Sequence, residues 1–393
     1  MISEFHFSST PHIHFGAGER SKLTELITSY GKKVVFVTGA NAFDSSDRCQ
    51  HLWQELDRNF DIRRVKVSGE PSPQLVDEAV AEHHGFSADC VVALGGGSAV
   101  DAGKAIAGLL PGGGSVMEFL EGVGKGREYS GPSTPFIAVP TTAGTGGETS
   151  KNAVLSVVGE QGFKKSFRHE TLVARHIILD PELTIACPAE LTAACGMDAL
   201  TQLLESYVST AASPMSDSLA INGLERVRDS LLIAVEHGED IEARADMLYA
   251  ASLSGLTLAN AGLGSVHGLA SPLGAYFPIP HGVVCGTLLF EATQANIVAM
   301  YDRAPDHPSL EKYADVGRLL TGQGSLDSFA AREALLGILQ AWSGRLKMPR
   351  LSQFGVGEEH IERVVAGSRG NSMQTNPVRL TDQEIASIVR RRL

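Results

Sequence analysis

Residues 90–110 read CVVALGGGSAVDAGKAIAGLL, and this stretch decides the fold. Its first five residues form a short, continuous apolar run, which is typical of a strand buried on both faces of a sheet. Three glycines follow at once, and the spacing of the apolar residues after them predicts a helix over residues 99–110. A strand that passes through glycines directly into a helix indicates an α/β unit.

The glycines at positions 95–97 and the start of the next helix have the chemistry of a pyrophosphate site. A backbone without Cβ atoms can bring its N–H groups close to an anion. The free N–H groups and the positive dipole end of the helix face the same place. The spacing is not the G-x-G-x-x-G of ordinary dinucleotide folds, so a plain turn with Ser98 as its N-cap is the competing interpretation.

Strands and helices alternate through the rest of the first half. Apolar or alternating runs at residues 34–38, 62–67 and 135–139 predict strands, while residues 46–58 and a segment from Ser72 onward predict helices. This order indicates a doubly wound, mostly parallel, Rossmann-like sheet.

A second polar loop follows the strand at residues 135–139. Residues 140–150 read PTTAGTGGETS and carry five hydroxyls and three glycines. Open α/β sheets bind ligands at the carboxyl ends of their strands. The threonines could contact ribose or phosphate there, or they could merely cap a helix. Two such loops on one sheet favour a nucleotide site.

The second half of the chain reads as helical. Apolar residues recur there at three- to five-residue steps, for example from Leu219 to Leu231, and few β-branched runs occur. We therefore expect two domains, an α/β dinucleotide-binding domain over residues 1–182 and an all-α metal and substrate domain over residues 183–393. A ligand is expected in the cleft between them.

Composition excludes several classes of protein. The chain has 393 residues and a net charge of −12, and neither half is basic, so nucleic-acid binding has no electrostatic support. The five cysteines are scattered and form no C-x-x-C pair, which fits a cytoplasmic protein with reduced thiols. We see no signal peptide and no run of 18 apolar residues, so we expect no membrane span.

A candidate metal site lies in the second half. Asp198 and Gln202 are four residues apart on a predicted helix and share one face, and His267 and His281 follow later. One carboxylate, two imidazoles and one amide oxygen could surround zinc or ferrous iron and leave a position for substrate. A chain with 13 histidines has many ordinary pairs, so a satisfied core role for His267 is the alternative.

At this point the sequence resembles the group III, iron-dependent alcohol dehydrogenases, which share a fold with glycerol dehydrogenase and dehydroquinate synthase. The resemblance runs from Phe15-Gly16 to the C-terminal helix. The motifs that carry it are GGGSAVDAGKAIA (95–107), PTTAGTGGETS (140–150), ILDPELT (178–184), MDALTQLLESYVS (197–209) and HGLASPLGAYFPIPHG (267–282).

The resemblance implies an NAD(P)-dependent oxidoreductase that interconverts alcohols and aldehydes or ketones by hydride transfer, with a divalent metal that polarises the substrate oxygen. It implies Fe²⁺ as the metal, with Asp198, Gln202, His267 and His281 as its position, and Gly96, Gly97 and Ser98 as the pyrophosphate site. We also expect a small-molecule substrate and a homodimer or higher homo-oligomer. The remaining positions implied for the cofactor are Asp101, Thr141, Thr142, Thr145, Asn152, Lys164 and Leu183.

Two departures from the family pattern concern the metal and the proton path. Family members usually have histidine where this chain has Gln202, and an amide is a weaker, neutral donor, so zinc or another ion becomes an alternative to iron. Many members carry a further histidine at the position of Ser271. If that histidine relays a proton, Ser271 can do so only as part of a hydroxyl–water chain, and we count it with His267 and His281 as catalytic.

A third departure concerns the choice of cofactor. Many NAD-preferring members have aspartate at the position of Gly39, where a carboxylate would bond the ribose 2′-hydroxyl and repel a 2′-phosphate. Gly39 removes that repulsion and Asn41 could donate to a phosphate, so we expect NADP(H) to be accepted. The simpler interpretation is that Gly39 is a turn residue and NAD(H) still binds.

Other functions fit the same motifs. One is a maleylacetate reductase-like activity on an oxo-acid, which basic residues facing the cleft would favour. Another is a cyclase like dehydroquinate synthase, against which the poverty of Lys and Arg between residues 186 and 290 argues. The last is a non-catalytic nucleotide-binding relative that has lost its metal.

Overall fold

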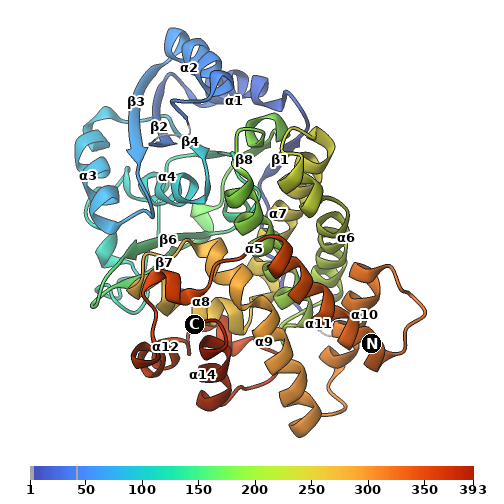
Figure 1. Cartoon of the computed structure of the whole chain (residues 1–393). Coiled ribbons are helices and arrows are strands. Elements are labelled where there is room, and N and C mark those ends of the chain that lie inside the picture. The colour runs from blue at the N-terminus through green and yellow to red at the C-terminus, as the bar shows by residue number, and fades with distance from the viewer. Residues whose placement is uncertain (1–3, 41–42) are drawn as a thin grey trace.

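The computed structural model describes residues 4–40 and 43–393. Its central feature is a six-stranded sheet in which every pair of neighbouring strands is parallel. Both faces of this sheet are covered, as Figure 1 shows, so the expected doubly wound α/β architecture is confirmed. In spatial order the strands are β1 (His12–Phe15), β8 (His176–Leu179), β5 (Phe136–Pro140), β4 (Cys90–Gly95), β2 (Lys33–Gly39) and β3 (Asp61–Val67).

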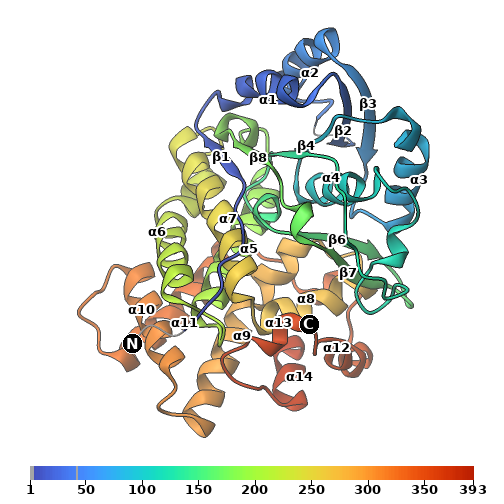
Figure 2. The same cartoon turned by 180° about the vertical axis from the view of Figure 1, so that it is seen from behind.

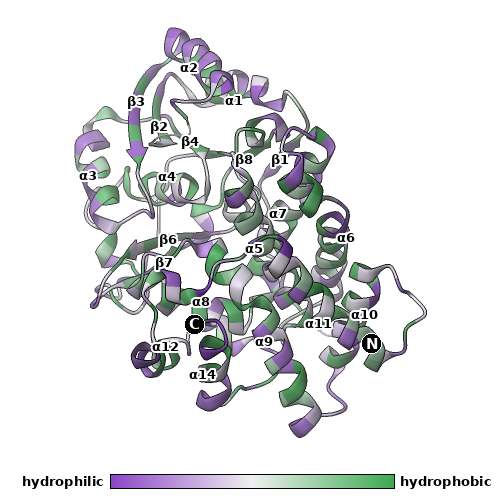
Figure 3. Ribbon diagram, viewed as in Figure 1, coloured by the Kyte–Doolittle hydropathy of each residue, from purple (hydrophilic) through white to green (hydrophobic). Residues whose placement is uncertain are grey.

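The buried strands carry apolar residues on both faces. In β2, Val34 and Phe36 pack on one side with α1 and α2, whereas Val35 and Val37 pack on the other with α3 and α4. This is why β2 and β4 read as continuous apolar runs rather than alternating ones. Figure 3 shows the same contrast, with hydrophobic residues along the central strands and hydrophilic ones on the outer side of α2. The four helices are α1 (Leu23–Tyr30), α2 (Asp47–Asn59), α3 (Pro73–His83) and α4 (Gly97–Leu109).

An antiparallel hairpin lies between the sheet and the helical half. It comprises β6 (Asn152–Val157) and β7 (Phe163–Arg168), and it packs against α4 on one side and α8 on the other (Figures 1 and 2). The sequence did not predict this hairpin, and it did not predict β1 or β8. β1, at the edge of the sheet, and β8, between β1 and β5, have four residues each, too few to show a period.

The rest of the chain is helical, as expected. α8 and α9 were not predicted, and α8 contains Pro272 and two glycines, which disfavour a helix. The helices are α5 (Ala189–Val208), α6 (Pro214–Glu236), α7 (Ile241–Ala261), α8 (Ser265–Tyr276), α9 (His281–Arg303), α10 (Pro308–Thr321), α11 (Ser328–Arg345), α12 (Ile361–Gly367), α13 (Asn371–Gln374) and α14 (Asp382–Arg390).

α9 is the one described helix long and apolar enough to cross a membrane by length and composition. Its most apolar window is 78% buried inside the protein, where it packs against α5, α8 and α14. That burial is typical of a core helix in a helical domain. α9 therefore lies at the centre of the helical half, where it carries His281 and Cys285.

Candidate active site

The two polar loops meet at one edge of the sheet. β4 and β5 are parallel neighbours with Gly95 opposite Pro140, so their carboxyl ends lie side by side. A Cβ added at Gly97 would lie 3.3 Å from the hydroxyl oxygen of Thr145, and one at Gly96 would lie 3.5 Å from that of Thr142. The glycine turn and the threonine-rich loop thus face each other. Any side chain at Gly96 or Gly97 would narrow the space between them.

The turn itself needs glycine. A Cβ at Gly95 would lie 2.8 Å from the Cβ of Ala99, closer than packed carbons approach. α4 begins at Gly97 with Gly96 as its N-cap, and no side chain caps it. Ser98 is therefore not the N-cap that the simpler interpretation assumed, and its hydroxyl lies inside the first helical turn. The first N–H groups of α4 are available to an anion.

A buried lysine holds the threonine-rich loop in place. The ammonium of Lys104, on α4, donates to the main-chain oxygens of Gly147 (2.6 Å), Ser150 (2.8 Å) and Asn152 (2.7 Å). Burial lowers the pKa of Lys104 to about 8, against the opposing effect of Asp101 and Glu148. The ammonium of Lys104 therefore bonds to main-chain oxygens inside the protein and does not point toward a ligand.

The other residues expected at the cofactor are spread along the same edge. Asp101 lies on α4 near Gly147, and burial raises its pKa to about 6. Asn152 begins β6, and Leu183 lies in the apolar core beside Ile178. Gly39 ends β2, and Asn41 lies outside the described residues.

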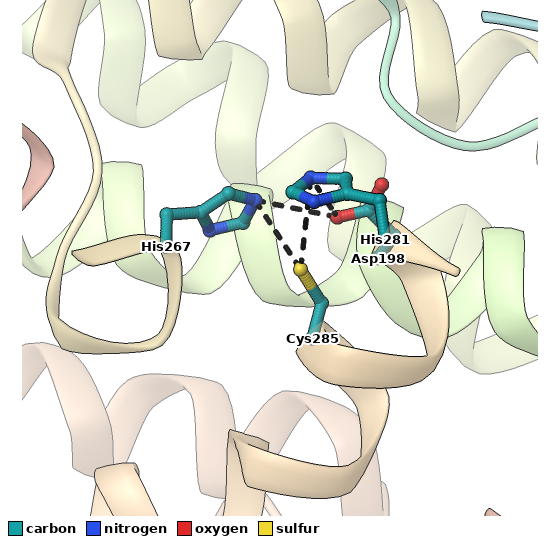
Figure 4. A group of neighbouring side chains, drawn as sticks. All are labelled: Asp198, His267, His281 and Cys285. Carbon is teal, nitrogen blue, oxygen red and sulfur yellow. Dashed lines mark hydrogen bonds and ion pairs between the residues drawn. The ribbon is translucent and has the colours of Figure 1, made fainter. Parts of the chain in front are cut away.

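A second cluster forms where α5, α8 and α9 meet (Figure 4). Asp198 on α5 directs Oδ1 to within 3.3 Å of His267 Nε2 and 3.8 Å of His281 Nε2. A fourth side chain, Cys285, points into the same group, and all four offer one ligand atom within 4.8 Å of one another. The sequence predicted the first three residues and missed the fourth.

Hydrogen bonding fixes the tautomer of His267. Its Nδ1 lies 2.7 Å from Glu205 Oε2, and since a carboxylate only accepts, Nδ1 must be the donor. The other oxygen of Glu205 accepts from the backbone N–H of Val266, so the carboxylate is itself held. In the neutral ring Nε2 then carries a lone pair and faces Asp198 Oδ1, an acceptor facing an acceptor.

That arrangement fits a divalent cation. Asp198 Oδ1 is buried and has no hydrogen-bond partner in the described part of the chain, which is costly unless a positive group satisfies it. Carboxylate and imidazole are ligands for zinc and ferrous iron, and a carboxylate–histidine pair such as Glu205–His267 commonly orients a metal-bound ring. The residues present therefore fit the metal that the family resemblance implied.

Without a metal, a proton on His267 can take the place of the cation beside the Asp198 carboxylate. Burial alone would raise the pKa of Asp198, but the two imidazoles outweigh it and lower the pKa to about 2. Burial lowers the pKa of His281 to about 4. For His267 burial works downward, but Cys285, Asp198 and Glu205 raise its pKa well above the usual value. A metal would have to displace that proton.

Comparison with known proteins assigns the family. The model of iron-containing alcohol dehydrogenase matches residues 10–181, and the model of the C-terminal part of the Fe-containing alcohol dehydrogenase family matches residues 192–393. The chain belongs to the iron-containing alcohol dehydrogenase family. The expected class of enzyme, a metal-dependent NAD(P) oxidoreductase acting on alcohols, is confirmed by this membership.

The similarity to individual proteins extends over nearly the full chain. Alcohol dehydrogenase 4 of Saccharomyces cerevisiae is 32% identical over 100% of this chain and 99% of its own length. The 1,3-propanediol dehydrogenase of Klebsiella pneumoniae is 34% identical over 95% of this chain and 93% of its own. The solved structure of the alcohol dehydrogenase from Oenococcus oeni superposes with a TM-score of 0.89 at 29% identity, covering 99% of this chain and 100% of that one.

In this iron-containing alcohol dehydrogenase, Gln202 and Ser271, which the sequence predicts to depart from the family pattern, both donate to main-chain oxygens. Gln202 Nε2 donates to the main-chain oxygen of Thr145 (3.2 Å), and its Oε1 is buried without a partner among the described residues. Ser271, on α8, donates to the main-chain oxygen of Lys164 (3.3 Å). Lys164, on β7, pairs with Glu70 at 3.0 Å, and this pair lies close enough to His281 to affect its pKa.

Three residues of the site were missed by sequence reasoning. Cys285 follows His281 by four residues on α9, and Glu205 follows Asp198 by seven on α5, so both spacings place them on the ligand faces of their helices. Either could have been found by counting turns once the helix was known. Glu70 precedes α3 in a loop, and its spacing carried no such signal.

Proposed function

We propose that the enzyme transfers hydride between NAD(P)H and a small aldehyde or ketone, and in reverse from the alcohol, between its glycine and threonine loops and the Asp198 cluster. The observation that carries this proposal is the bond from Gln202 to the main chain of Thr145, because it joins the metal-binding helix α5 to the nucleotide loop. Gln202 thus connects the proposed cofactor site with the proposed metal and substrate site. Such a connection is suited to a reaction in which cofactor and substrate must be held next to each other.

In this proposal residues 1–182 hold the dinucleotide and residues 183–393 hold the metal and substrate. The N–H groups at the start of α4 hold the pyrophosphate, with Gly96, Gly97 and Ser98 around it. Thr142 and Thr145 lie opposite this turn. The positions that complete the proposed cofactor site are Asp101, Thr141, Asn152, Lys164 and Leu183.

Asp198, His267 and His281 hold the cation, and Glu205 keeps the ring of His267 oriented. When bound, the metal supplies Lewis-acid polarisation of the substrate oxygen. The hydroxyl of Ser271 donates to the main-chain oxygen of Lys164, which leaves its own oxygen as an acceptor in the hydroxyl–water chain that we propose for the substrate's proton.

The end of β2 supports acceptance of NADP(H). A Cβ at Gly39 would have none of the described residues within 4 Å, so the position is open. On the neighbouring strand β3, Arg64 donates to the hydroxyl of Thr38 (2.9 Å) and Lys66 is half-exposed, and the two cations share one carboxylate, Asp44. Two cations that share one carboxylate on these three side chains favour a 2′-phosphate.

The oxo-acid reductase alternative loses support. It needs free basic groups at the cleft, yet Lys104 is bonded to main-chain oxygens and Lys164 is neutralised by Glu70. A cytoplasmic location and a homodimer or higher homo-oligomer belong to the proposal as expectations from the sequence.

The test is a steady-state assay with matched variants. Enzyme purified without chelator should oxidise NADPH or NADH in the presence of short aldehydes and added Zn²⁺ or Fe²⁺. Asp198→Asn should abolish turnover and still bind NADPH, as followed by nucleotide fluorescence, whereas Asp229→Asn on the exposed face of α6 should retain both. Nucleotide binding without turnover, with any divalent metal and any substrate of the panel, would instead support the non-catalytic alternative.

A further inference from the structure

The thiol of Cys285 lies beside the two imidazoles, of His267 and His281, that are proposed to bind the cation. It lies one helical turn after His281 on α9, so the two side chains leave the same face of the helix. Its sulfur is 3.6 Å from His267 Nε2 and 3.8 Å from His281 Nε2, and it is fully buried. Figure 4 shows the thiol directed at the point on which both rings and Asp198 converge.

The distances match the edges of a metal tetrahedron. With metal–nitrogen or metal–oxygen bonds of about 2.0–2.1 Å and metal–sulfur bonds of about 2.3 Å, tetrahedral ligands lie roughly 3.3 Å apart for nitrogen and oxygen and roughly 3.6 Å apart for nitrogen and sulfur. The corresponding separations here are 3.3 Å between Asp198 and His267 and 3.6 Å between His267 and Cys285. The two contacts of His281 are slightly longer, 3.8 Å each.

We propose that the thiolate of Cys285 is the fourth protein ligand of the metal, and that the resulting Asp/His/His/Cys set selects Zn²⁺ over Fe²⁺. The proposal rests on the proposed function only in that a cation binds at this cluster. On binding, the thiol gives its proton to solvent and the sulfur lone pair forms the bond to the metal. Thiolate is the softest donor of the set, and tetrahedral mixed nitrogen and sulfur sites are typical of zinc.

Gln202 is the competing candidate for the fourth position. Its amide nitrogen is already committed to the main-chain oxygen of Thr145, which draws the group toward the nucleotide loop. An amide oxygen is also neutral, whereas a thiolate adds a negative charge beside the metal. Zinc accepts a fifth ligand, so four protein ligands are compatible with the proposed reaction.

The alternative role for Cys285 is a buried thiol that only makes a weak hydrogen bond to an imidazole. Its neighbours Val284 and Leu288 lie in the apolar core, so a packing role alone would also explain burial. The two roles differ in one measurable respect, because only a ligand changes the electronic spectrum of the bound metal.

Cobalt substitution provides that measurement. The full-length enzyme, stripped of metal and reloaded with Co²⁺, should show an intense near-ultraviolet sulfur-to-cobalt charge-transfer band together with visible d–d bands. Cys285→Ser and Cys285→Ala should lose the charge-transfer band. Cys195→Ala is the matched control, since Cys195 is a free cysteine on the same helix as Asp198 but its sulfur is not one of the four clustered ligand atoms. It should keep the band.

Metal selectivity gives a second readout. In competition with a chelator, Cys285→Ser should bind Zn²⁺ at least about tenfold more weakly, since even residues that only orient a ligand cost about 10–100-fold. Fe²⁺ binding should change less. Thermal unfolding of the metal-free variants checks that the fold survives, and the isosteric serine guards against loss of packing.

The possible outcomes distinguish a failure of the ligand assignment for Cys285 from a failure of the proposed metal-dependent function. If wild-type enzyme binds Co²⁺ but shows only d–d bands, or if Cys285→Ala leaves the charge-transfer band unchanged, Cys285 is not a ligand, although the metal site stands. If the wild-type enzyme binds neither Co²⁺ nor Zn²⁺, the proposed metal-dependent function falls together with the ligand assignment.

Discussion

The side chain of Gln202 and the main chain of Thr145 are joined by a hydrogen bond of 3.2 Å between the amide nitrogen and the carbonyl oxygen. This bond spans the two halves of the molecule, from α5 to the loop after β5. The family resemblance led us to expect a metal-binding histidine at position 202, but the amide found there is bonded to the threonine-rich loop. The substitution therefore has consequences for two sites, and each can be measured separately.

Replacing Gln202 by histidine should strengthen the binding of iron and weaken the binding of NADPH. Gln202→His should raise the ratio of bound iron to bound zinc, because an imidazole adds a donor to the cluster. It should also raise the KM for NADPH about two- to tenfold, since the anchor of the loop is lost and a neutral hydrogen bond contributes about 0.5–1.5 kcal/mol. Elemental analysis after loading with equal Fe²⁺ and Zn²⁺, and initial rates, check the two parts. An unchanged metal ratio would mean that position 202 does not face the cation.

The carboxylate of Glu205 offers a test of how His267 is oriented. Glu205→Gln keeps an acceptor for the N–H of Val266 but removes the charge beside His267 Nδ1. We expect zinc affinity to fall about 10–100-fold, as is usual when such an orienting group is lost. Chelator competition measures it, with Glu190→Gln on the exposed first turn of α5 as the control. Equal affinities in the two variants would show that His267 does not depend on Glu205.

How far the sequence predicts this molecule depends on the length and regularity of each element. β4 was predictable because a short, continuous apolar run that ends in glycines leaves little choice. β7 was missed because Lys164, Lys165 and Arg168 make it read as a polar loop, although it pairs in register with β6. Its stability comes from packing against α4 and α8, which are distant in sequence.

Some residues of the candidate site could likewise be predicted from the sequence, and others could not. Asp198, His267 and His281 stand in motifs that carry chemistry by their residue types, whereas Cys285 becomes a candidate only once α9 is known to begin at His281. Lys104 stands in the glycine-rich motif, where a basic residue suggests phosphate binding, yet its ammonium points away to three main-chain oxygens. Side-chain direction depends on neighbouring elements, and spacing along one element does not report it.

A histidine cluster at the edge of the sheet predicts a pH-dependent stability. His14 Nε2 and His176 Nδ1 share a hydrogen bond of 3.2 Å, and the ring of His12 stacks on that of His176. Burial, followed by the charges of His14 and His12, lowers the pKa of His176. The unfolded chain therefore gains a proton first as the pH falls below the ordinary histidine value, and the folded state loses stability in that window.

His176→Gln should consequently lose less free energy of unfolding than the wild type when the pH is lowered from about 7.5 to about 5. Glutamine keeps a hydrogen-bonding group opposite His14 but cannot be protonated. Urea unfolding at the two pH values measures the difference, and His51→Gln, on the exposed side of α2, is the control. If both variants lose as much as the wild type, the acid sensitivity arises elsewhere.

The prediction that the enzyme accepts NADP(H) rests on Gly39, where the structure has room for an acidic side chain. Gly39→Asp introduces a carboxylate at the end of β2, and none of the described residues would lie within 4 Å of its Cβ. Repulsion between this carboxylate and a 2′-phosphate is roughly 1–4 kcal/mol at about 4 Å, depending on solvent access. The ratio of kcat/KM for NADPH to that for NADH should therefore fall at least about fivefold. Gly39→Asn, which is similar in size but neutral, should leave the ratio near that of the wild type. A strong preference of the wild-type enzyme for NADH would contradict the role assigned to Gly39, whatever the variants do.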